Sequence, residues 1–135
     1  MRVLIDSNVF VSALLRSASC RGIVEALRDG AFTLITSAAL VDELAAVVER
    51  PKFSERISPE DRRNLLALIR EEGRLVLPKR STVPIRDPKD RPVLECAYAA
   101  ELLVTGDHDL LVLGRIGTTR VLTPGELLAL LEGRG

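Results

Sequence analysis

The stretch Val3-Leu4-Ile5-Asp6-Ser7-Asn8 joins a short apolar run to an acidic residue and two small polar residues. An apolar run that contains β-branched residues is typical of a strand buried on both faces. The stretch Leu102-Leu103-Val104-Thr105 has the same character, and Gly106-Asp107-His108-Asp109 follows it. Both stretches therefore predict a buried strand with carboxylates at its carboxyl end.

Further apolar segments alternate with helical ones along the rest of the chain. Strands are also expected at Phe32–Thr36, Leu75–Leu77 and Arg120–Leu122. Helices are expected at Val9–Leu15, Cys20–Arg28, Ala38–Glu49, Pro59–Glu72, Arg91–Ala100 and Pro124–Glu132. This alternation predicts βαβ units and an α/β fold, with a mostly parallel sheet covered by helices on both faces. Ligands bind such sheets outside the carboxyl ends of the strands.

The composition indicates one domain over residues 1–135. Hydrophobic residues make up 47% of the chain, and 19 basic residues balance 19 acidic ones, which excludes a disordered chain. Two cysteines are too few for a disulfide scaffold. No segment is apolar enough to span a membrane, and Asp6 comes too early for a signal-peptide core, so we expect a cytoplasmic protein. With a formal net charge of zero and four aromatic residues, the chain lacks the general features of a nucleic-acid binder.

Helical periodicity places two more acidic residues. On the Ala38–Glu49 helix, Glu43 borders the apolar stripe, whereas Asp42 faces water. Pro92 must lie in the first turn of its helix, which puts Asp90 in that turn and on the side facing the sheet. Each acidic residue also has an ordinary interpretation. Those at strand or helix ends could be helix caps, and Glu43 could lay its stem on the core with its carboxylate in water.

The acidic residues converge on one edge of the predicted sheet. The set consists of Asp6, Glu43, Asp90 and Asp107, together with Asp109. Two unit charges about 4 Å apart repel by about 4 kcal/mol at an effective dielectric constant of 20, so the carboxylates must be partly protonated or neutralised by cations. One histidine and two distant cysteines cannot form a closed zinc site, and oxygen ligands favour Mg²⁺ or Mn²⁺. The pattern predicts a metal pocket.

These motifs resemble those of PIN-domain nucleases, in particular the toxin-like members of bacteria and archaea. The resemblance spans about residues 2 to 125 and rests on four stretches, which are 3–10, 37–43, 87–97 and 104–111. It implies an α/β/α sandwich with strand order 3-2-1-4-5 and cleavage of single-stranded RNA that depends on one or two Mg²⁺ or Mn²⁺ ions. It also implies an antitoxin protein as a partner and a homodimer.

The resemblance assigns roles to individual residues. Asp6, Glu43, Asp90 and Asp107 would be the acidic quartet, and Asp109 an accessory metal ligand. Asn8 and Thr105 would support these ligands through hydrogen bonds. Asp87, which precedes Pro88, is better explained as a turn or cap residue.

Basic residues cluster in two stretches that could flank the pocket and contact phosphates. Residues 79–91 contain Lys89 and Arg91 among five basic residues, and residues 50–63 contain Arg50 and Lys52 among another five. Ordinary solvated charge is the alternative explanation. His108 could assist proton transfer or could simply be an exposed loop residue.

Three other classes of protein are alternatives to a PIN-domain nuclease. A receiver-type signalling domain needs an aspartate after its third strand, where Pro78 stands, and a lysine after its fifth, where Thr123 stands. A haloacid-dehalogenase-like phosphatase needs a second aspartate at the position of Asn8. A catalytically silent PIN-like scaffold that binds RNA or a protein stays open as the alternative to a nuclease.

Overall fold

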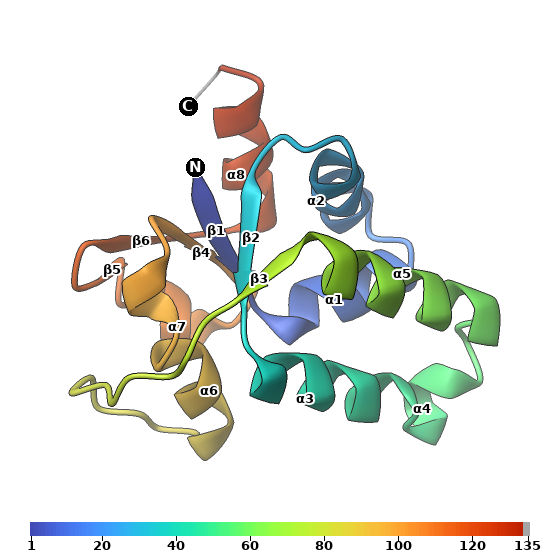
Figure 1. Ribbon diagram of the computed structural model, residues 1–135, viewed down its shortest axis with the longest axis horizontal. Helices are drawn as coiled ribbons and strands as arrows, with labels where there is room; N and C mark the ends of the chain where they lie inside the picture. Colours follow the sequence, from blue (N-terminus) through green and yellow to red (C-terminus); the bar gives the residue numbers. More distant parts are fainter. Residues whose placement is uncertain (134–135) are drawn as a thin grey trace.

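The computed structural model describes residues 1–133, which form a six-stranded sheet flanked by helices (Figure 1). The strands are β1 (Arg2–Ile5), β2 (Thr33–Thr36), β3 (Gly73–Leu75), β4 (Leu102–Val104), β5 (Arg115–Ile116) and β6 (Thr119–Leu122). Their order in the sheet is β3-β2-β1-β4-β6-β5, and every neighbouring pair is parallel except β5 and β6.

Helices of very different length connect the strands. The α-helices are α1 (Ser7–Leu14), α2 (Ala18–Arg28), α3 (Ala38–Val48), α4 (Pro51–Ser54), α5 (Pro59–Glu72), α6 (Arg91–Leu94), α7 (His108–Leu111) and α8 (Pro124–Leu131). Two 3₁₀ turns, η1 (Pro88–Asp90) and η2 (Ala97–Ala99), flank α6. Within residues 1–133, no helix has the length and hydropathy needed to cross a lipid bilayer.

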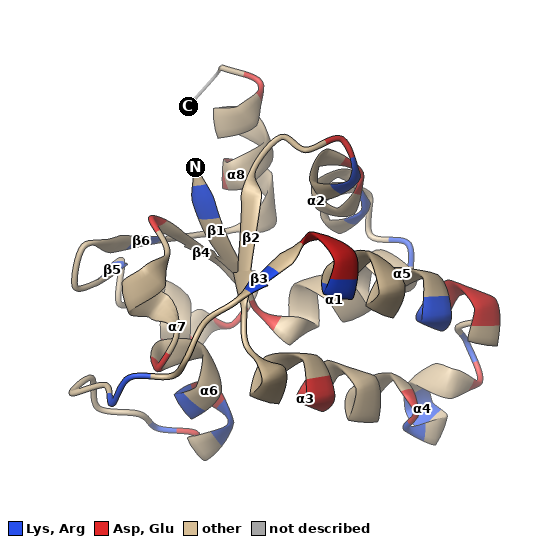
Figure 2. Cartoon of the chain, viewed as in Figure 1, with Lys and Arg blue, Asp and Glu red and all other residues tan. Residues whose placement is uncertain are grey.

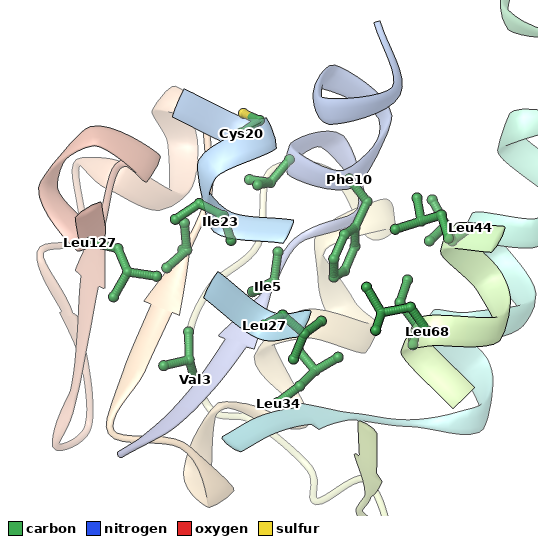
Figure 3. Close-up of a cluster of buried hydrophobic side chains, with 14 of the residues drawn as sticks. Val3, Ile5, Phe10, Cys20, Ile23, Leu27, Leu34, Leu44, Leu68 and Leu127 are labelled. Atoms are coloured by element: carbon green, nitrogen blue, oxygen red, sulfur yellow. The ribbon is translucent and has the colours of Figure 1, made fainter. Parts of the chain in front are cut away.

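Side chains alternate between the two faces of the sheet. In β1, Val3 and Ile5 join a buried cluster with residues of α1, α2, α3, α5 and α8 (Figure 3). Leu4 points the other way, into a second cluster that contains residues of α6 and α7. The central strands are therefore buried on both faces, which is why they read as continuous apolar runs. The expected three-layer α/β/α class is confirmed.

The order expected for the parallel strands is also present, with β6 as the predicted fifth strand. The edge strand β5 was not expected. It is two residues long and turns back into β6 through Gly117, whose φ of 60° lies in the left-handed region. A strand this short carries no periodic signal.

The strand expected at Leu75–Leu77 lies two residues earlier, because β3 starts where α5 ends. The junction is Gly73, where a Cβ atom would lie 2.5 Å from the backbone oxygen of Ile69. Leu75 and Leu77 are 63% and 81% exposed. The apolar run suggested a buried strand, but it belongs to an exposed edge and the loop beyond it.

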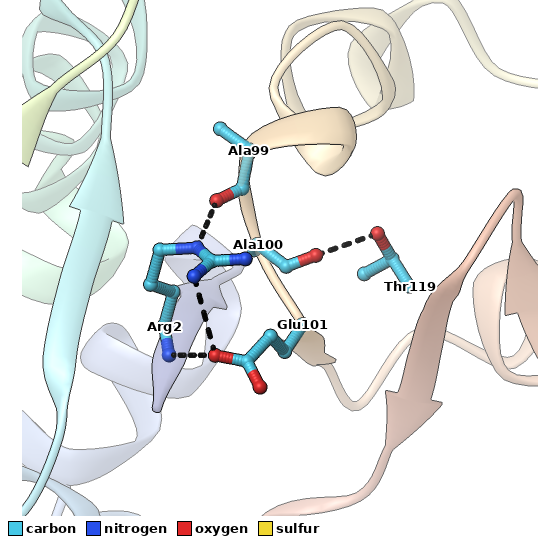
Figure 4. Close-up of polar contacts among 5 residues, drawn as sticks. All are labelled: Arg2, Ala99, Ala100, Glu101 and Thr119. Carbon is cyan, nitrogen blue, oxygen red and sulfur yellow. Dashed lines mark hydrogen bonds and ion pairs between the residues drawn. The ribbon is translucent and has the colours of Figure 1, made fainter.

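The helix expected at Arg91–Ala100 is interrupted, because α6 ends at Leu94 and only the 3₁₀ turn η2 follows it; long-range hydrogen bonds hold the last residues of this segment (Figure 4). The buried hydroxyl of Thr119 lies 2.6 Å from the carbonyl oxygen of Ala97 and 2.8 Å from that of Ala100. Arg2 Nε donates to the carbonyl of Ala99 at 3.0 Å. In a continuing helix these carbonyl groups would accept from residues 101 to 104, so the long-range bonds mark the end of the segment before β4.

Candidate active site

The parallel register of β1 and β4 brings the acidic strand ends together. Ile5 pairs with Val104, and the Asp6 amide donates to the Val104 carbonyl at 2.9 Å. Asp6 and the segment from Thr105 to Asp107 therefore leave the same edge of the sheet.

A cavity of about 410 Å³ opens at this edge, a volume typical of ligand sites. Its polar and charged lining consists of Asp6, Ser7, Asn8, Ser12, Glu43, Arg50, Lys52, Asp87, Lys89, Asp90 and Asp107. Its apolar lining consists of Val11, Leu15, Val47 and Phe53. The cavity thus collects the four acidic residues that the resemblance picked out, from β1, α3, η1 and the β4–α7 loop.

Hydrogen bonds fix the Asp6 carboxylate from two sides. The Thr105 hydroxyl donates to Asp6 Oδ2 at 2.8 Å, and Asn8 Nδ2 donates to the same oxygen at 3.3 Å. Thr105 Oγ1 also accepts from the Asp107 amide at 3.0 Å, and Asn8 Oδ1 accepts from the Gly106 amide at 3.4 Å. Asn8 and Thr105 thus tie the two strand ends together through one carboxylate oxygen.

Asp90 is the only charged residue within 1–133 that is buried, with an exposed fraction of 8%. Burial, followed by the charge of Asp107 and a hydrogen bond to the Asp107 carboxyl group, raises the pKa of Asp90 from 3.8 to about 6. Asp6 adds to this effect. Burial also raises the pKa of Asp6, opposed by the Thr105 hydrogen bond. The three aspartates therefore form one electrostatically coupled group.

Glu43 approaches this group from α3. Its side chain is half-buried while Asp42 is exposed, as the helical phase indicated. Burial raises the pKa of Glu43 and the charge of Asp6 adds to the rise, whereas a hydrogen bond to Ser7 and the charges of Arg50 and Lys89 oppose it. The pKa of Glu43 therefore depends both on the charge of Asp6 and on the charges of Arg50 and Lys89.

The helix-cap interpretation holds for some of these aspartates and not for others. Asp6 and Asp90 occupy N-cap positions, but their side chains make no capping hydrogen bond. Asp107 does cap α7, because its Oδ1 accepts from the Asp109 amide at 2.9 Å. Asp87 caps η1 in the same way through the Lys89 amide, as expected, and it also lines the cavity.

Four residues considered from the sequence lie outside the cavity lining, and one of them, the buried Thr105, reaches the site only through its hydrogen bonds to Asp6 and Asp107. Asp109 pairs with Arg86 at 3.4 Å between Oδ1 and Nη1, Arg91 is exposed on α6, and His108 is exposed on α7. Lys89 does line the cavity, as do Arg50 and Lys52 from the second basic stretch. Basic residues of α4 and of the α6 segment thus flank the acidic edge (Figure 2).

Sequence reasoning missed Ser7 and Phe53 in the lining. Ser7 directly follows Asp6, so its position next to the site could have been inferred from the motif. Phe53 lies on α4, a four-residue helix whose only sequence signal is Pro51 at its first position.

The donor set fits a hard divalent cation by its chemistry. All the acidic groups are oxygen donors, and within residues 1–133 neither Asp6, Asp90 nor Asp107 forms an ion pair with a lysine or arginine. No group of three or more Asp, Glu, His or Cys side chains in this part of the chain stands ready-formed as a metal site. Side-chain rotation would therefore be needed to bring the carboxylates onto one ion.

The sheet and the acidic cavity define a mixed α/β domain with oxygen-donor side chains at the carboxyl edge of its strands, and comparison with known proteins gives the family. A family model for the PIN domain matches residues 2–109, and the chain belongs to the PIN-domain family. Among curated proteins, it is 27% identical over 116 residues to Uncharacterized protein MJ1680 of Methanocaldococcus jannaschii, which covers 84% of this chain and 75% of the relative. PIN domains are generally nucleases and typically use divalent metal ions.

Proposed function

We propose that this protein is a metal-dependent endoribonuclease that hydrolyses phosphodiester bonds of single-stranded RNA. The observation that carries the proposal is the group of Asp6, Asp90 and Asp107, which meets at the carboxyl edge of the sheet and has no lysine or arginine ion-pair partner among residues 1–133. Such a group suits a cation better than any neutral ligand. The cavity has the size of a small-ligand site, and single-stranded RNA as the substrate is supported by the resemblance of the motifs to PIN-domain nucleases.

In this proposal, Asp6, Glu43, Asp90 and Asp107 hold one or two Mg²⁺ or Mn²⁺ ions. When bound, such a cation supplies an activated water for attack on phosphorus and stabilises the charge of the phosphate. Asp109 would join as an accessory ligand only after leaving Arg86, because the two are ion-paired.

The remaining residues of the site position the carboxylates or attract the phosphate groups of the substrate. Thr105 and Asn8 hold Asp6 in one orientation, so the carboxylate loses little freedom when it binds a cation. Lys89 extends a positive charge over the acidic edge and is placed to meet a phosphate of the substrate. Arg91 lies off the lining and would act only through the wider field of the loop.

We further propose that the protein is the toxin of a toxin–antitoxin pair and acts as a homodimer in the cytoplasm, with an antitoxin protein as its partner. The resemblance of the motifs to the toxin-like branch supports this role. Induced expression should arrest growth of a bacterial host, and the Asp90→Asn variant should not. Normal growth with a well-expressed, RNA-cleaving wild type would contradict the toxin role while leaving the nuclease.

The alternative function is a catalytically silent scaffold that binds RNA or a protein. It is favoured by one observation, the absence of a ready-formed group of three metal ligands within residues 1–133. A scaffold would bind RNA equally well in Mg²⁺ and in EDTA, and it would leave the RNA intact.

Cleavage of a mixed-sequence single-stranded RNA distinguishes the two functions. Purified protein is incubated with Mg²⁺, with Mn²⁺ or with EDTA, next to Asp90→Asn and the matched control Asp42→Asn. We expect cleavage by the wild type and by Asp42→Asn only with a metal ion, and a loss of at least 100-fold in Asp90→Asn, on the order of mutational losses at electrostatic catalytic groups. Intact RNA under every condition, from protein shown to be folded, would contradict the nuclease.

A further inference from the structure

The cavity is a trench between two helices. On α1 and the residue that follows it, the lining residues are Asn8, Val11, Ser12 and Leu15, and on α3 and just beyond it they are Glu43, Val47 and Arg50. Positions three or four apart lie on one face of a helix, so each helix presents one continuous stripe to the trench. Glu43 and Val47 are four residues apart on α3, or about 6 Å at 1.5 Å per residue, and Arg50 follows beyond the end of the helix, where α4 starts. The trench therefore extends well beyond the carboxylates.

The two ends of the trench differ in chemistry. The inner end, at the sheet, carries the coupled aspartates. The outer end carries Arg50 and Lys52, the apolar side chains of Leu15 and Val47, and the ring of Phe53. A nucleotide is divided in a similar way, because an anionic phosphate is joined to a flat base whose two faces are apolar.

Among the described residues that line this cavity, Phe53 is the only aromatic one. The other two phenylalanines, Phe10 and Phe32, are buried at 4% and 6% exposure. Phe53 is only half-buried, and one part of it packs against the core cluster shared by α1, α3 and α5. Its ring is therefore held from the inside while part of it stays accessible.

The short helix α4 holds this ring in place. Pro51 starts α4, the Phe53 amide donates to the Arg50 carbonyl at 2.8 Å, and the Ile57 amide donates to the Phe53 carbonyl at 3.0 Å. Lys52 Nζ lies over the ring, 5.2 Å from its centroid, so its flexible side chain has to move aside when a base stacks on that face. An aromatic surface and a cation thus stand together at the outer end.

We propose that Phe53 is the stacking platform for a nucleobase next to the scissile phosphate, with Arg50 and Lys52 binding the adjacent backbone phosphate. This inference rests on the proposed function, because it assigns one part of the RNA substrate to one part of the same cavity. Stacking on an aromatic ring accepts every base, so the subsite gives affinity for unpaired nucleotides without selecting a sequence.

Binding of short RNAs tests the platform independently of cleavage. The probes are a fluorescently labelled tetranucleotide and four versions that each lack one base, and binding is followed by anisotropy in Mg²⁺ with Asp90→Asn as the parent protein. Phe53→Leu removes the ring and keeps an apolar side chain, Phe53→Trp keeps an aromatic ring, and Phe32→Leu is the matched control at a buried phenylalanine outside the cavity.

We expect Phe53→Leu to weaken binding of the intact RNA roughly 5- to 100-fold, the range for loss of one base–aromatic stack, while Phe53→Trp and Phe32→Leu bind as the parent does. Removing one particular base should weaken the parent by the same factor and leave Phe53→Leu unaffected. The inference would be overturned if Phe53→Leu bound the intact RNA and all four abasic versions more weakly than the parent by the same factor, or if it bound the intact RNA as well as the parent does. If wild-type protein cleaves no RNA but this binding pattern is found, the platform stands and the nuclease proposal fails.

Discussion

Replacing Asp90 by asparagine should stabilise the metal-free protein at neutral pH. Asp90 is buried next to Asp107, and its pKa is raised from 3.8 to about 6, so keeping the carboxylate ionised in the folded state costs up to about 3 kcal/mol at 1.36 kcal/mol per pKa unit. Asparagine has the same shape, carries no charge and can donate to the Asp107 carboxylate. The substitution therefore removes the cost without opening a cavity.

The direction of the pH dependence follows from the raised pKa. The folded state binds the proton more tightly than the unfolded chain, so the favourable contribution is full below pH 3.8 and is lost as the pH rises through about 6. Wild-type protein should therefore lose stability relative to Asp90→Asn between pH 4 and pH 7.

Thermal unfolding in EDTA from pH 4 to pH 8 measures the effect. We expect the Tm of Asp90→Asn to exceed that of the wild type by roughly 5–10 °C at pH 7.5, at about 4 °C per kcal/mol for a domain of this size, and the difference to vanish near pH 4. Asp42→Asn, on the exposed face of α3, should stay within about 0.5 kcal/mol of the wild type throughout. An Asp90→Asn protein that is less stable at pH 7.5, or whose advantage does not depend on pH, would refute the reasoning.

Three further predictions concern other parts of the molecule. Lys89→Glu should weaken single-stranded RNA binding and reduce its dependence on salt, whereas Arg91→Glu, which lies off the cavity, should change both far less; equal effects in a salt titration would contradict this. Thr105→Val should cost about 1–3 kcal/mol in urea unfolding because it removes the donor to the Asp6 carboxylate and the acceptor of the partly buried Asp107 amide, and metal-dependent cleavage should fall at least 10-fold; unchanged cleavage would show that the hydroxyl does not position the carboxylates. Gly73→Ala should cost about 1–3 kcal/mol, since its Cβ would overlap a backbone oxygen, and leave RNA affinity unchanged; a wild-type Tm would contradict the close approach.

Local sequence signals were sufficient wherever one segment determined the outcome. Apolar runs located the central strands, and the acidic residues that follow β1 and β4 had to meet once those strands were parallel neighbours. The position of Pro92 fixed the phase that buries Asp90. Each of these predictions needs only the geometry of one helix or one sheet edge, and together they identified the acidic residues that line the cavity. The metal-binding and catalytic roles of these residues stay predictions.

Long-range partners explain most of what the sequence could not predict. Asp109 follows the same strand end as Asp107, but Arg86 from a distant loop pairs with it. The carbonyl groups of Ala97 and Ala100, after the end of α6, bind the hydroxyl of Thr119, about twenty residues later in the chain. Phe53 stood in a segment too short for any periodic pattern. In each case a contact between separate segments outweighs local preference.

Calorimetric titration of the metal-free protein with Mn²⁺ tests the central claim most directly, because it asks whether the acidic edge holds a cation without requiring the right RNA. The account predicts one or two binding sites in the wild type, unchanged binding in Asp42→Asn, and at least a tenfold loss of affinity in Asp90→Asn, in line with the cost of losing a ligand or its support. Saturable binding of equal affinity in all three proteins, or no binding by the wild type, would contradict it.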